Sequence, residues 1–231
     1  SPDVVGLQET KVEDALFPLL DLQAIGYQCA FAGQKSYNGV AILSKQTPDE
    51  VRVGFRNGYD AENCRLIAAQ LHGVWFVNVY VPQGQSIESE KFAYKLEFLR
   101  QLRAELANYP PDKLVLMGDL NIAPDERDVV DPVAMRNVVS FLPEERAALQ
   151  DLMALGLQDT FRKFHSEGGH YSWWDYRTRG FERNDGMRID HLLLSSALYD
   201  RTTDCEIDLD NRAQPKPSDH APVMCTLTLA E

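Results

Sequence analysis

The segment Leu114-Val115-Leu116-Met117-Gly118-Asp119-Leu120-Asn121 is an apolar run that gives way abruptly to an acidic residue and an amide. Its Val- and Leu-rich first half is typical of a buried strand. Asp119 therefore stands where that strand is expected to end. Taken alone, Asp119 could cap the following turn, and Asn121 could bond to nearby backbone.

Three further segments show the same pattern of polar residues at the edge of an apolar run. They are residues 4–11 with Glu9, residues 187–194 with Asp190, and residues 216–223 with Asp219 and His220. Each has an ordinary interpretation as a strand-end carboxylate or a turn. Asp190 resists that interpretation, because it lies within an apolar run and a buried carboxylate is costly unless it is paired or binds a cation. Four such segments in one chain favour a shared site.

Strand-like and helix-like segments follow one another along the whole chain. The clearest helix is expected at 89–108, where apolar residues fall close to one stripe, and a second at 143–155. Strands outnumber helices and the helices come singly, which favours an α+β fold with two packed sheets and helices outside. With 231 residues and 44% hydrophobic content, a single domain over 1–231 is expected. Examples of the strand-like runs are 3–7, 39–43, 66–71, 74–81, 113–117, 188–194 and 221–229, and residues 202–214 look strand-like and then turn-like.

The composition limits the functions that are open to the chain. A formal net charge of −12 alone argues against a nucleic-acid partner, since phosphate contacts need Lys and Arg. It excludes neither a local basic face nor a metal-dependent phosphodiesterase, which needs a carboxylate cluster. No apolar run approaches the roughly 18 to 20 residues of a membrane helix, and no signal peptide opens the chain. We therefore expect a cytoplasmic protein with no membrane partner.

Cysteine and most histidine residues point to no site of their own. The four cysteines are scattered without close pairs, which predicts reduced thiols rather than a zinc site or a disulfide framework. Three histidines lie outside the four segments, and a fourth neighbours Asp190 but should point to the opposite face of that strand, so none of them belongs to a motif. These are His72, His165, His170 and His191.

Glu, Asp, Asn and His together suit the hydrolysis of a phosphodiester. Mg²⁺ prefers oxygen ligands, usually one or two carboxylates with water and substrate phosphate. The reaction needs charge neutralisation at the phosphate, a carboxylate that positions or deprotonates water, and a donor for the developing charge. A histidine held by an acidic partner can be that donor.

The chain resembles the exonuclease III and abasic-site (AP) endonuclease branch of the endonuclease/exonuclease/phosphatase superfamily. The resemblance covers essentially the whole chain, and the order and approximate spacing of the motifs also match. The motifs are GLQETK (6–11), GQK (33–35), YNGVA (37–41), NVYVPQG (78–84), GDLNIAP (118–124), WWDYR (173–177), RID (188–190) and PSDHAPV (217–223).

The resemblance implies a four-layer α/β/β/α sandwich of two mixed sheets flanked by helices. It also implies roles for single residues, with Glu9 as principal Mg²⁺ ligand, Asp119 orienting or deprotonating water, and Asp190 paired with His220. The implied catalytic residues are Tyr80, Asp119, Asn121, Asp190 and His220. The implied metal-binding residues are Glu9, Asp119, Asn121, Asp219 and His220.

The positions that face DNA in the family are matched by Arg65, Gln83, Lys91 and Arg177. Trp173, with Met187 and Ile189 beside it, is similar to the apolar wall around a flipped-out abasic sugar. Two alternatives stay open. Residues 177–188 carry four arginines but also Glu182 and Asp185, so they could be a solvated loop of mixed charge. Trp173 and Trp174 could both pack in the core, although neighbouring strand residues point to opposite faces.

The activity that the resemblance implies is cleavage of double-stranded DNA 5′ to abasic sites, with 3′→5′ exonuclease and 3′-phosphatase or 3′-phosphodiesterase activity at blocked 3′ ends. Mg²⁺ is the implied cofactor, with Mn²⁺ as a substitute, and we expect a monomer, associated with the nucleoid in a prokaryote. A specialised 3′-end-processing nuclease with weak abasic-site cleavage is one alternative. A catalytically silent DNA-end-binding protein is another, against which the intact residue set argues.

The chain departs from the family pattern at its start. The family opens with a strand that carries an Asn, followed by a helix, whereas residues 2–9 match the family's second strand. Roughly 25 to 30 residues of the pattern, about one strand–helix unit, are therefore expected to be missing. We expect this to weaken stability and turnover, and restoring such a strand should raise both.

Overall fold

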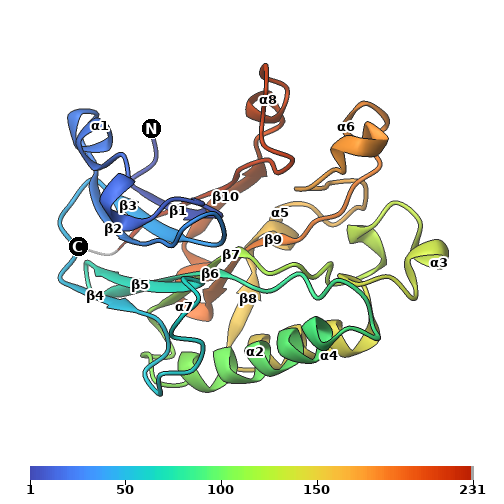
Figure 1. Ribbon diagram of the computed structural model, residues 1–231, viewed down its shortest axis with the longest axis horizontal. Coiled ribbons are helices and arrows are strands. Elements are labelled where there is room, and N and C mark those ends of the chain that lie inside the picture. Colours follow the sequence, from blue (N-terminus) through green and yellow to red (C-terminus); the bar gives the residue numbers. More distant parts are fainter. Residues whose placement is uncertain (230–231) are drawn as a thin grey trace.

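A six-stranded mixed sheet forms the centre of the molecule in this computed structural model, which describes residues 1–229 (Figure 1). Its strands stand in the order β4-β5-β6-β7-β9-β8; β6 and β7 run parallel, and the other neighbours are antiparallel. The strands are β4 (Glu50–Val53), β5 (Leu66–Leu71), β6 (Val74–Tyr80), β7 (Leu114–Asp119), β8 (Leu157–Asp159) and β9 (Asp190–Ser195).

The second sheet layer consists of two antiparallel pieces. One contains β1 (Val4–Gln8), β3 (Val40–Ser44) and β2 (Gln28–Ala32), in that order, and the other pairs β10 (Thr202–Ile207) with β11 (Val223–Leu227). Apolar side chains from both pieces, such as Ile42 and Leu227, pack in one cluster with the central sheet. The predicted fold of packed sheets flanked by helices is confirmed, and within residues 1–229 the mixed strand directions belong to the central sheet.

Helices cover the outer faces of these layers. The two longest, α2 (Glu90–Leu106) and α4 (Pro143–Met153), pack on the central sheet through residues such as Phe98 and Leu149. Both were predicted, and Ser89 caps α2 by accepting a hydrogen bond from the Lys91 N–H at 3.1 Å. None of the helices within the described residues combines the length and the apolar character needed to cross a membrane.

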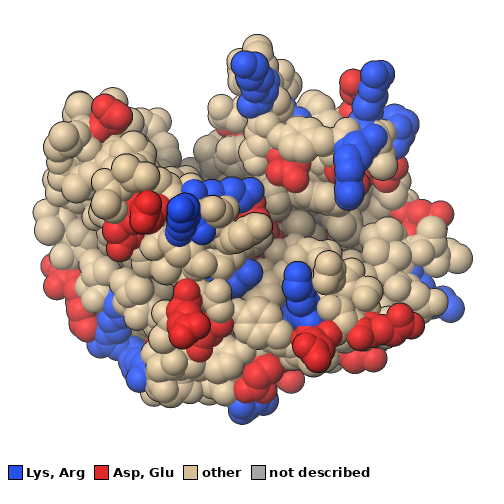
Figure 2. Space-filling view, viewed as in Figure 1, with Lys and Arg blue, Asp and Glu red and all other residues tan. Residues whose placement is uncertain are grey.

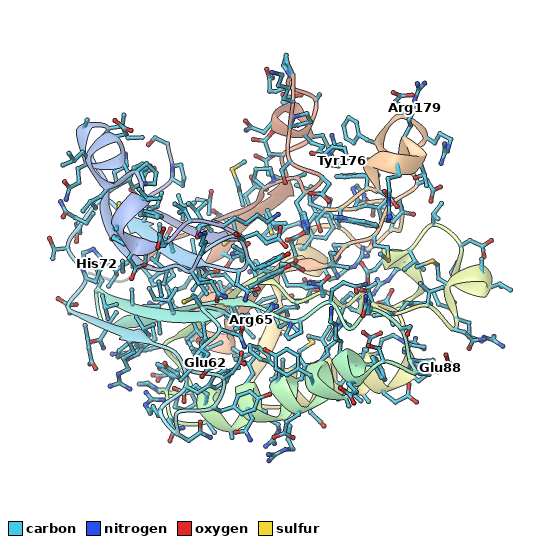
Figure 3. All side chains as sticks on the ribbon, viewed as in Figure 1. Glu62, Arg65, His72, Glu88, Tyr176 and Arg179 are labelled. Carbon is cyan, nitrogen blue, oxygen red and sulfur yellow. The ribbon has the colours of Figure 1, made fainter. Side chains whose placement is uncertain are left out.

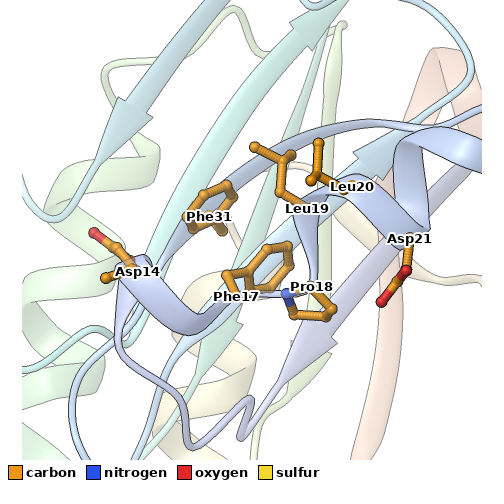
Figure 4. A pocket seen from close by; sticks show the side chains of 8 residues that line it. Asp14, Phe17, Pro18, Leu19, Leu20, Asp21 and Phe31 are labelled. Atoms are coloured by element: carbon orange, nitrogen blue, oxygen red, sulfur yellow. The ribbon is translucent and has the colours of Figure 1, made fainter.

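The opposite outer face, on the three-stranded piece, carries α1 (Leu19–Ala24). Phe17 and Phe31 stack there with ring centroids 4.1 Å apart, and a pocket opens beside them (Figure 4). This pocket is lined by residues 14–15, residues 17–21 and Phe31, and it contains none of the predicted site residues.

The remaining elements are short and lie in the connections, and α6 and α8 project from the same edge of the molecule (Figure 1). The expected strand and turn over 202–214 correspond to β10 and α8. All four cysteines are free thiols. The short elements are η1 (Asp14–Leu16), η2 (Glu126–Asp128), α3 (Pro132–Met135), α5 (Thr160–Phe164), η3 (Tyr176–Thr178), α6 (Gly180–Arg183), α7 (Ser196–Asp200) and α8 (Leu209–Arg212).

Candidate active site

Strand register places three of the predicted site residues in one row. Tyr80 at the end of β6 pairs with Asp119 at the end of β7, and Asp119 pairs with Asp190 at the start of β9. Directly paired residues on neighbouring strands project from the same face of a sheet. Gly118 has a φ of +133°, and a Cβ there would lie 2.1 Å from the Val79 carbonyl oxygen, so the close pairing of β6 with β7 requires glycine.

Asp119 and Asn121 form one hydrogen-bonded unit. The Asn121 N–H donates to Asp119 Oδ1 at 2.8 Å, and its side-chain amide donates to Oδ2 at 3.0 Å and to the Val81 carbonyl at 2.9 Å. Asn121 has a φ of 52°, a region that asparagine tolerates better than most residues. Burial of Asp119, followed by the negative charge of Asp190, raises the pKa of Asp119 to about 7. This carboxyl can therefore exchange a proton near neutral pH.

Asp190 and His220 form the predicted acid–imidazole pair. His220 Nδ1 lies 2.9 Å from Asp190 Oδ2, so Nε2 is the ring nitrogen left to contact a bound substrate. Burial works to lower the pKa of His220, but the carboxylates of Asp190, Asp119 and Asp219 together raise it to about 10. His220 is therefore protonated at neutral pH and can donate to an anionic oxygen.

Ser172 is a site residue that sequence reasoning missed. Its hydroxyl donates to Asp190 Oδ2 at 2.6 Å and accepts from the backbone N–H groups of Ile189 and Asp190, each at 3.0 Å. The Ser172 side chain is fully buried. Because Ser172 lies in an irregular connection beside the WWDYR motif, only the fold reveals that it orients the Asp190 carboxylate.

Glu9 follows β1, and its carboxylate is bound by two neighbours. Lys11 Nζ lies 2.7 Å from Glu9 Oε2, and the Tyr80 hydroxyl donates to Oε1. Burial disfavours the charged form, but these two hydrogen bonds hold the pKa of Glu9 below its ordinary value. Glu9 and Lys11 have φ values of 52° and 53°, an uncommon backbone conformation of the kind that accompanies functional sites.

Two members of the predicted metal set, Asp119 and His220, are brought together, and Asp190, which was predicted as a catalytic residue only, joins them. Ligand atoms of these three residues lie within 4.8 Å of one another. Glu9 and Asp219 lie outside this cluster, although Glu9 is near enough for the charge of His220 to lower its pKa. Two carboxylates, one of them buried with a raised pKa, supply oxygen donors and negative charge that a hard divalent cation would neutralise. The donor set therefore fits Mg²⁺.

Trp173 lies beside the acid–imidazole pair. Backbone bridges join it to Met187 and to His220, and its indole N–H donates to Asp219 Oδ2 at 3.1 Å. Trp173 and Met187 are half-buried and pack over Ile189, which is only 3% exposed. Ile189 thus supports this apolar patch from below and does not reach its surface. Trp174 is fully buried, so each Trp of the pair occupies a different environment.

Of the predicted DNA-facing residues, Arg65 contacts the row of Tyr80, Asp119 and Asp190 through Tyr80. Arg65 lies in the middle of the molecule (Figure 3), with its guanidinium 4.6 Å from the Tyr80 ring centroid and Nη1 donating to the Tyr80 carbonyl at 3.1 Å. Gln83 and Lys91 are exposed. The side chain of Arg177 is 87% exposed and forms an ion pair with Asp175.

Charge is distributed unevenly over this face. Figure 2 shows Lys and Arg around a hollow near α6 and α8, while Asp and Glu gather along the opposite edge, over α2. Within the basic loop, Arg188 is a correction to the sequence interpretation. It is 1% exposed and binds Asp128 and Asp159, each at 2.6 Å, so it is a structural residue and adds nothing to a DNA-facing surface.

Comparisons with known proteins agree with this geometry. Residues 1–220 match the Endonuclease/Exonuclease/phosphatase family. The chain is 42% identical to exodeoxyribonuclease III of Haemophilus influenzae, over 96% of this chain and 88% of that protein. It superposes on an AP endonuclease from Archaeoglobus fulgidus with a TM-score of 0.95 at 38% identity. It also superposes on the Neisseria 3′ phosphatase NExo bound to product DNA hairpin, with a TM-score of 0.93 at 40% identity. Each match covers 99% of this chain and 90% of the other. The chain therefore belongs to the endonuclease/exonuclease/phosphatase family, in the branch of exodeoxyribonuclease III and the AP endonucleases.

Proposed function

We propose that this protein is a Mg²⁺-dependent DNA-repair phosphodiesterase. It hydrolyses duplex DNA 5′ to abasic sites and processes 3′ ends by exonuclease and 3′-phosphatase or 3′-phosphodiesterase action, as a monomer. The observation that carries the proposal is the cluster of Asp119, Asp190 and His220 at one edge of the central sheet, beside the half-buried Trp173. A protein that only binds DNA ends would need no such cluster.

Asp119, Asp190 and Glu9 are the oxygen donors that would hold Mg²⁺, with Mn²⁺ as a substitute and Asn121, Asp219 and His220 close by. Bound there, the cation would neutralise charge on the phosphate and polarise its oxygens. Glu9 would have to release Lys11 or Tyr80 to take part, because both now occupy its carboxylate oxygens.

Residues of the chain accept the proton of the attacking water and donate hydrogen bonds to the phosphate. Asp119 orients the attacking water and receives its proton; in the metal-free protein, burial and Asp190 raise the pKa of this carboxyl to about 7. Asn121 fixes both Asp119 oxygens, so the carboxylate keeps one orientation. His220, held protonated by Asp190, donates a hydrogen bond from Nε2 to a phosphate oxygen. The Tyr80 hydroxyl, whose pKa is raised by burial and by Glu9, stays protonated and could do the same once it releases Glu9.

Substrate recognition combines phosphate contacts with one apolar surface. Arg65, Lys91 and Arg177 would meet backbone phosphates, with Gln83 beside them, and these contacts position the duplex without reading sequence. Trp173 and Met187 would accept a sugar that lacks a base, because their surface offers a normal nucleotide no hydrogen-bonding partner.

Specialised 3′-end processing is the second candidate. It is favoured by the 40% identity to the Neisseria 3′ phosphatase, which is close to the 38% identity to the Archaeoglobus AP endonuclease. The two candidates share the hydrolytic site and differ in how well the Trp173 surface admits an abasic sugar.

One assay tests the proposal and separates the candidates. The protein is incubated with a duplex that carries one abasic site and with a duplex that ends in a 3′-phosphate, each with Mg²⁺ and with EDTA. We expect Mg²⁺-dependent product from both duplexes. Product from the 3′-phosphate duplex alone would establish the specialised enzyme, and no Mg²⁺-dependent product from either would refute the proposal.

A further inference from the structure

A second group of metal-ligating side chains lies outside the active site, in the connection that follows α5. His165, Glu167 and His170 offer ligand atoms within 4.8 Å of one another. The segment His165-Ser166-Glu167-Gly168-Gly169-His170 folds back on itself, and Gly169 has a φ of +87°. The two imidazole rings are thereby brought together, with centroids 5.0 Å apart and planes inclined by 48°.

The hydrogen bond of His165 leaves its Nδ1 available to a cation. His165 Nε2 lies 2.8 Å from the Cys205 carbonyl oxygen in β10, an acceptor, so Nε2 carries the proton and Nδ1 presents its lone pair. Metal-bound histidines usually donate their other ring N–H to a backbone carbonyl in this way. The His165 ring is further fixed by stacking on Phe161, at 4.3 Å between centroids and 20° between planes.

The other two ligands are near each other and open to solvent. His170 Nε2 lies 3.2 Å from Glu167 Oε1, and the two side chains are 37% and 63% exposed. A cation could therefore enter and replace this weak contact, with water completing its coordination.

We propose that His165, Glu167 and His170 form a binding site for zinc or a similar borderline divalent cation. Two imidazoles and one carboxylate match the ligand preference of Zn²⁺, whereas Mg²⁺ prefers sites made of oxygen donors. This site is separate from the carboxylate-rich cluster of Asp119, Asp190 and His220, and it is independent of the function proposed above.

The place of the site in the chain indicates what the cation would do. Two residues after His170 comes Ser172, which orients Asp190, and then Trp173, which bridges to His220. A cation that joins both ends of the 165–170 loop would brace this segment and tie it to β10 through the Cys205 carbonyl. It would act as a structural clip beside the active site.

Zinc binding to the metal-free protein tests the proposal. Because zinc could also bind at the carboxylate cluster, the titration uses a His220→Gln background with excess Mg²⁺ and a chromophoric zinc indicator. We expect one equivalent of Zn²⁺ in this background. Adding His170→Gln should weaken that binding by at least about 100-fold, because losing a direct ligand should cost more than the 10- to 100-fold typical of residues that only support one.

Two further variants keep the test decisive. Glu167→Gln alters an exposed side chain and leaves both imidazoles. It replaces the charged carboxylate ligand by a neutral amide whose oxygen can still bind the cation, so it should weaken zinc binding by at least about 10-fold, less than His170→Gln does. His72→Asn removes an exposed histidine in the turn between β5 and β6 (Figure 3) and should leave zinc binding unchanged. Cobalt substitution should give a visible absorption band that His170→Gln abolishes. Zinc stoichiometry and affinity that are unaffected by His170→Gln, or affected equally by His72→Asn, would overturn the proposal.

Discussion

Replacing the buried Ser172 by alanine should weaken both the fold and the active site. The Ser172 hydroxyl donates to the Asp190 carboxylate at 2.6 Å and accepts from two backbone N–H groups. A hydrogen bond to a charged group contributes about 1.5 to 3 kcal/mol, and a buried donor left without a partner costs about 1 to 3 kcal/mol. Because the effects overlap and the cavity can admit water, we expect Ser172→Ala to lower the free energy of unfolding by roughly 2 to 4 kcal/mol.

The same substitution should lower kcat more than it raises KM. Ser172 contacts Asp190 and no expected substrate atom, so its loss lets the Asp190–His220 pair rotate without removing a DNA contact. We expect kcat to fall about 10- to 100-fold, as is typical for a residue that orients a site group. Urea unfolding followed by circular dichroism measures the first effect, and steady-state cleavage of a 3′-phosphate duplex measures the second.

Ser218→Ala is the matched control. Ser218 lies in the same neighbourhood and accepts a hydrogen bond from the His220 N–H at 3.1 Å, but it is exposed to water. Its replacement should change the unfolding free energy by less than about 1 kcal/mol. If Ser172→Ala unfolded within about 0.5 kcal/mol of the unmodified protein and kept its kcat, the role of Ser172 as the residue that orients Asp190 would be refuted.

Three other substitutions probe the network around the site. In metal-free protein, a raised His220 pKa contributes stability that is fully present below pH 6.5 and is lost as the pH rises towards 10. Asp190→Asn should make this decline smaller, because Asp190 contributes most of the charge and hydrogen bonding that raise the pKa, and urea unfolding across that range measures the change. Lys95→Met leaves the buried Glu145 carboxylate without its partner and should cost about 3 to 5 kcal/mol in urea unfolding, part of which Glu145→Gln should restore in the double variant. Gly118→Ala must displace β6 from β7, because its Cβ would lie 2.1 Å from a carbonyl oxygen; we expect a lower melting temperature and loss of cleavage, whereas an unchanged melting temperature would contradict the assigned register.

Sequence patterns predicted most of the strands and the candidate residues at their ends, but they did not single out β2, β4 or β8. Strand register depends on the alternation of apolar residues, and the polar residues that end β7 and begin β9 stand out against it. The pairing of Asp190 with His220 did not follow from this alternation and was implied by the family resemblance. The helix over 90–106 was equally clear, because its apolar stripe and its serine cap are both local signals.

Tertiary contacts determined what the sequence could not predict. Lys95 is fully buried on an amphipathic helix, where its ammonium donates to the Asn121 carbonyl at 2.7 Å and pairs with Glu145. No local pattern distinguishes such a lysine from an exposed one. The same holds for Ser172, and for Arg188, which looked like part of a basic DNA-facing loop but forms ion pairs with the buried Asp128 and the partly buried Asp159. Long-range ion pairs and hydrogen bonds leave no periodic signal.

The binding of Lys11 and Tyr80 to Glu9 also lay beyond sequence reasoning. The motif places Glu9 after β1, but only the structure shows that Glu9 and Lys11, which both have positive φ values, form an ion pair. A Lys11→Met variant would free one carboxylate oxygen of Glu9. If Glu9 must release Lys11 to hold the cation, this variant should need less Mg²⁺ for half-maximal cleavage. An unchanged Mg²⁺ requirement would show that Lys11 does not compete with the cation for Glu9.

We propose that Asp119, fixed by Asn121 and raised in pKa by burial, activates water for phosphodiester hydrolysis. Single-turnover cleavage of a 3′-phosphate or abasic duplex in Mg²⁺, measured for Asp119→Asn beside DNA binding by fluorescence anisotropy, tests it most directly. We predict that the variant binds DNA within about threefold of the unmodified protein while its cleavage rate falls by at least about 100-fold, as expected when a proton acceptor is lost. Cleavage at the unmodified rate would contradict the account.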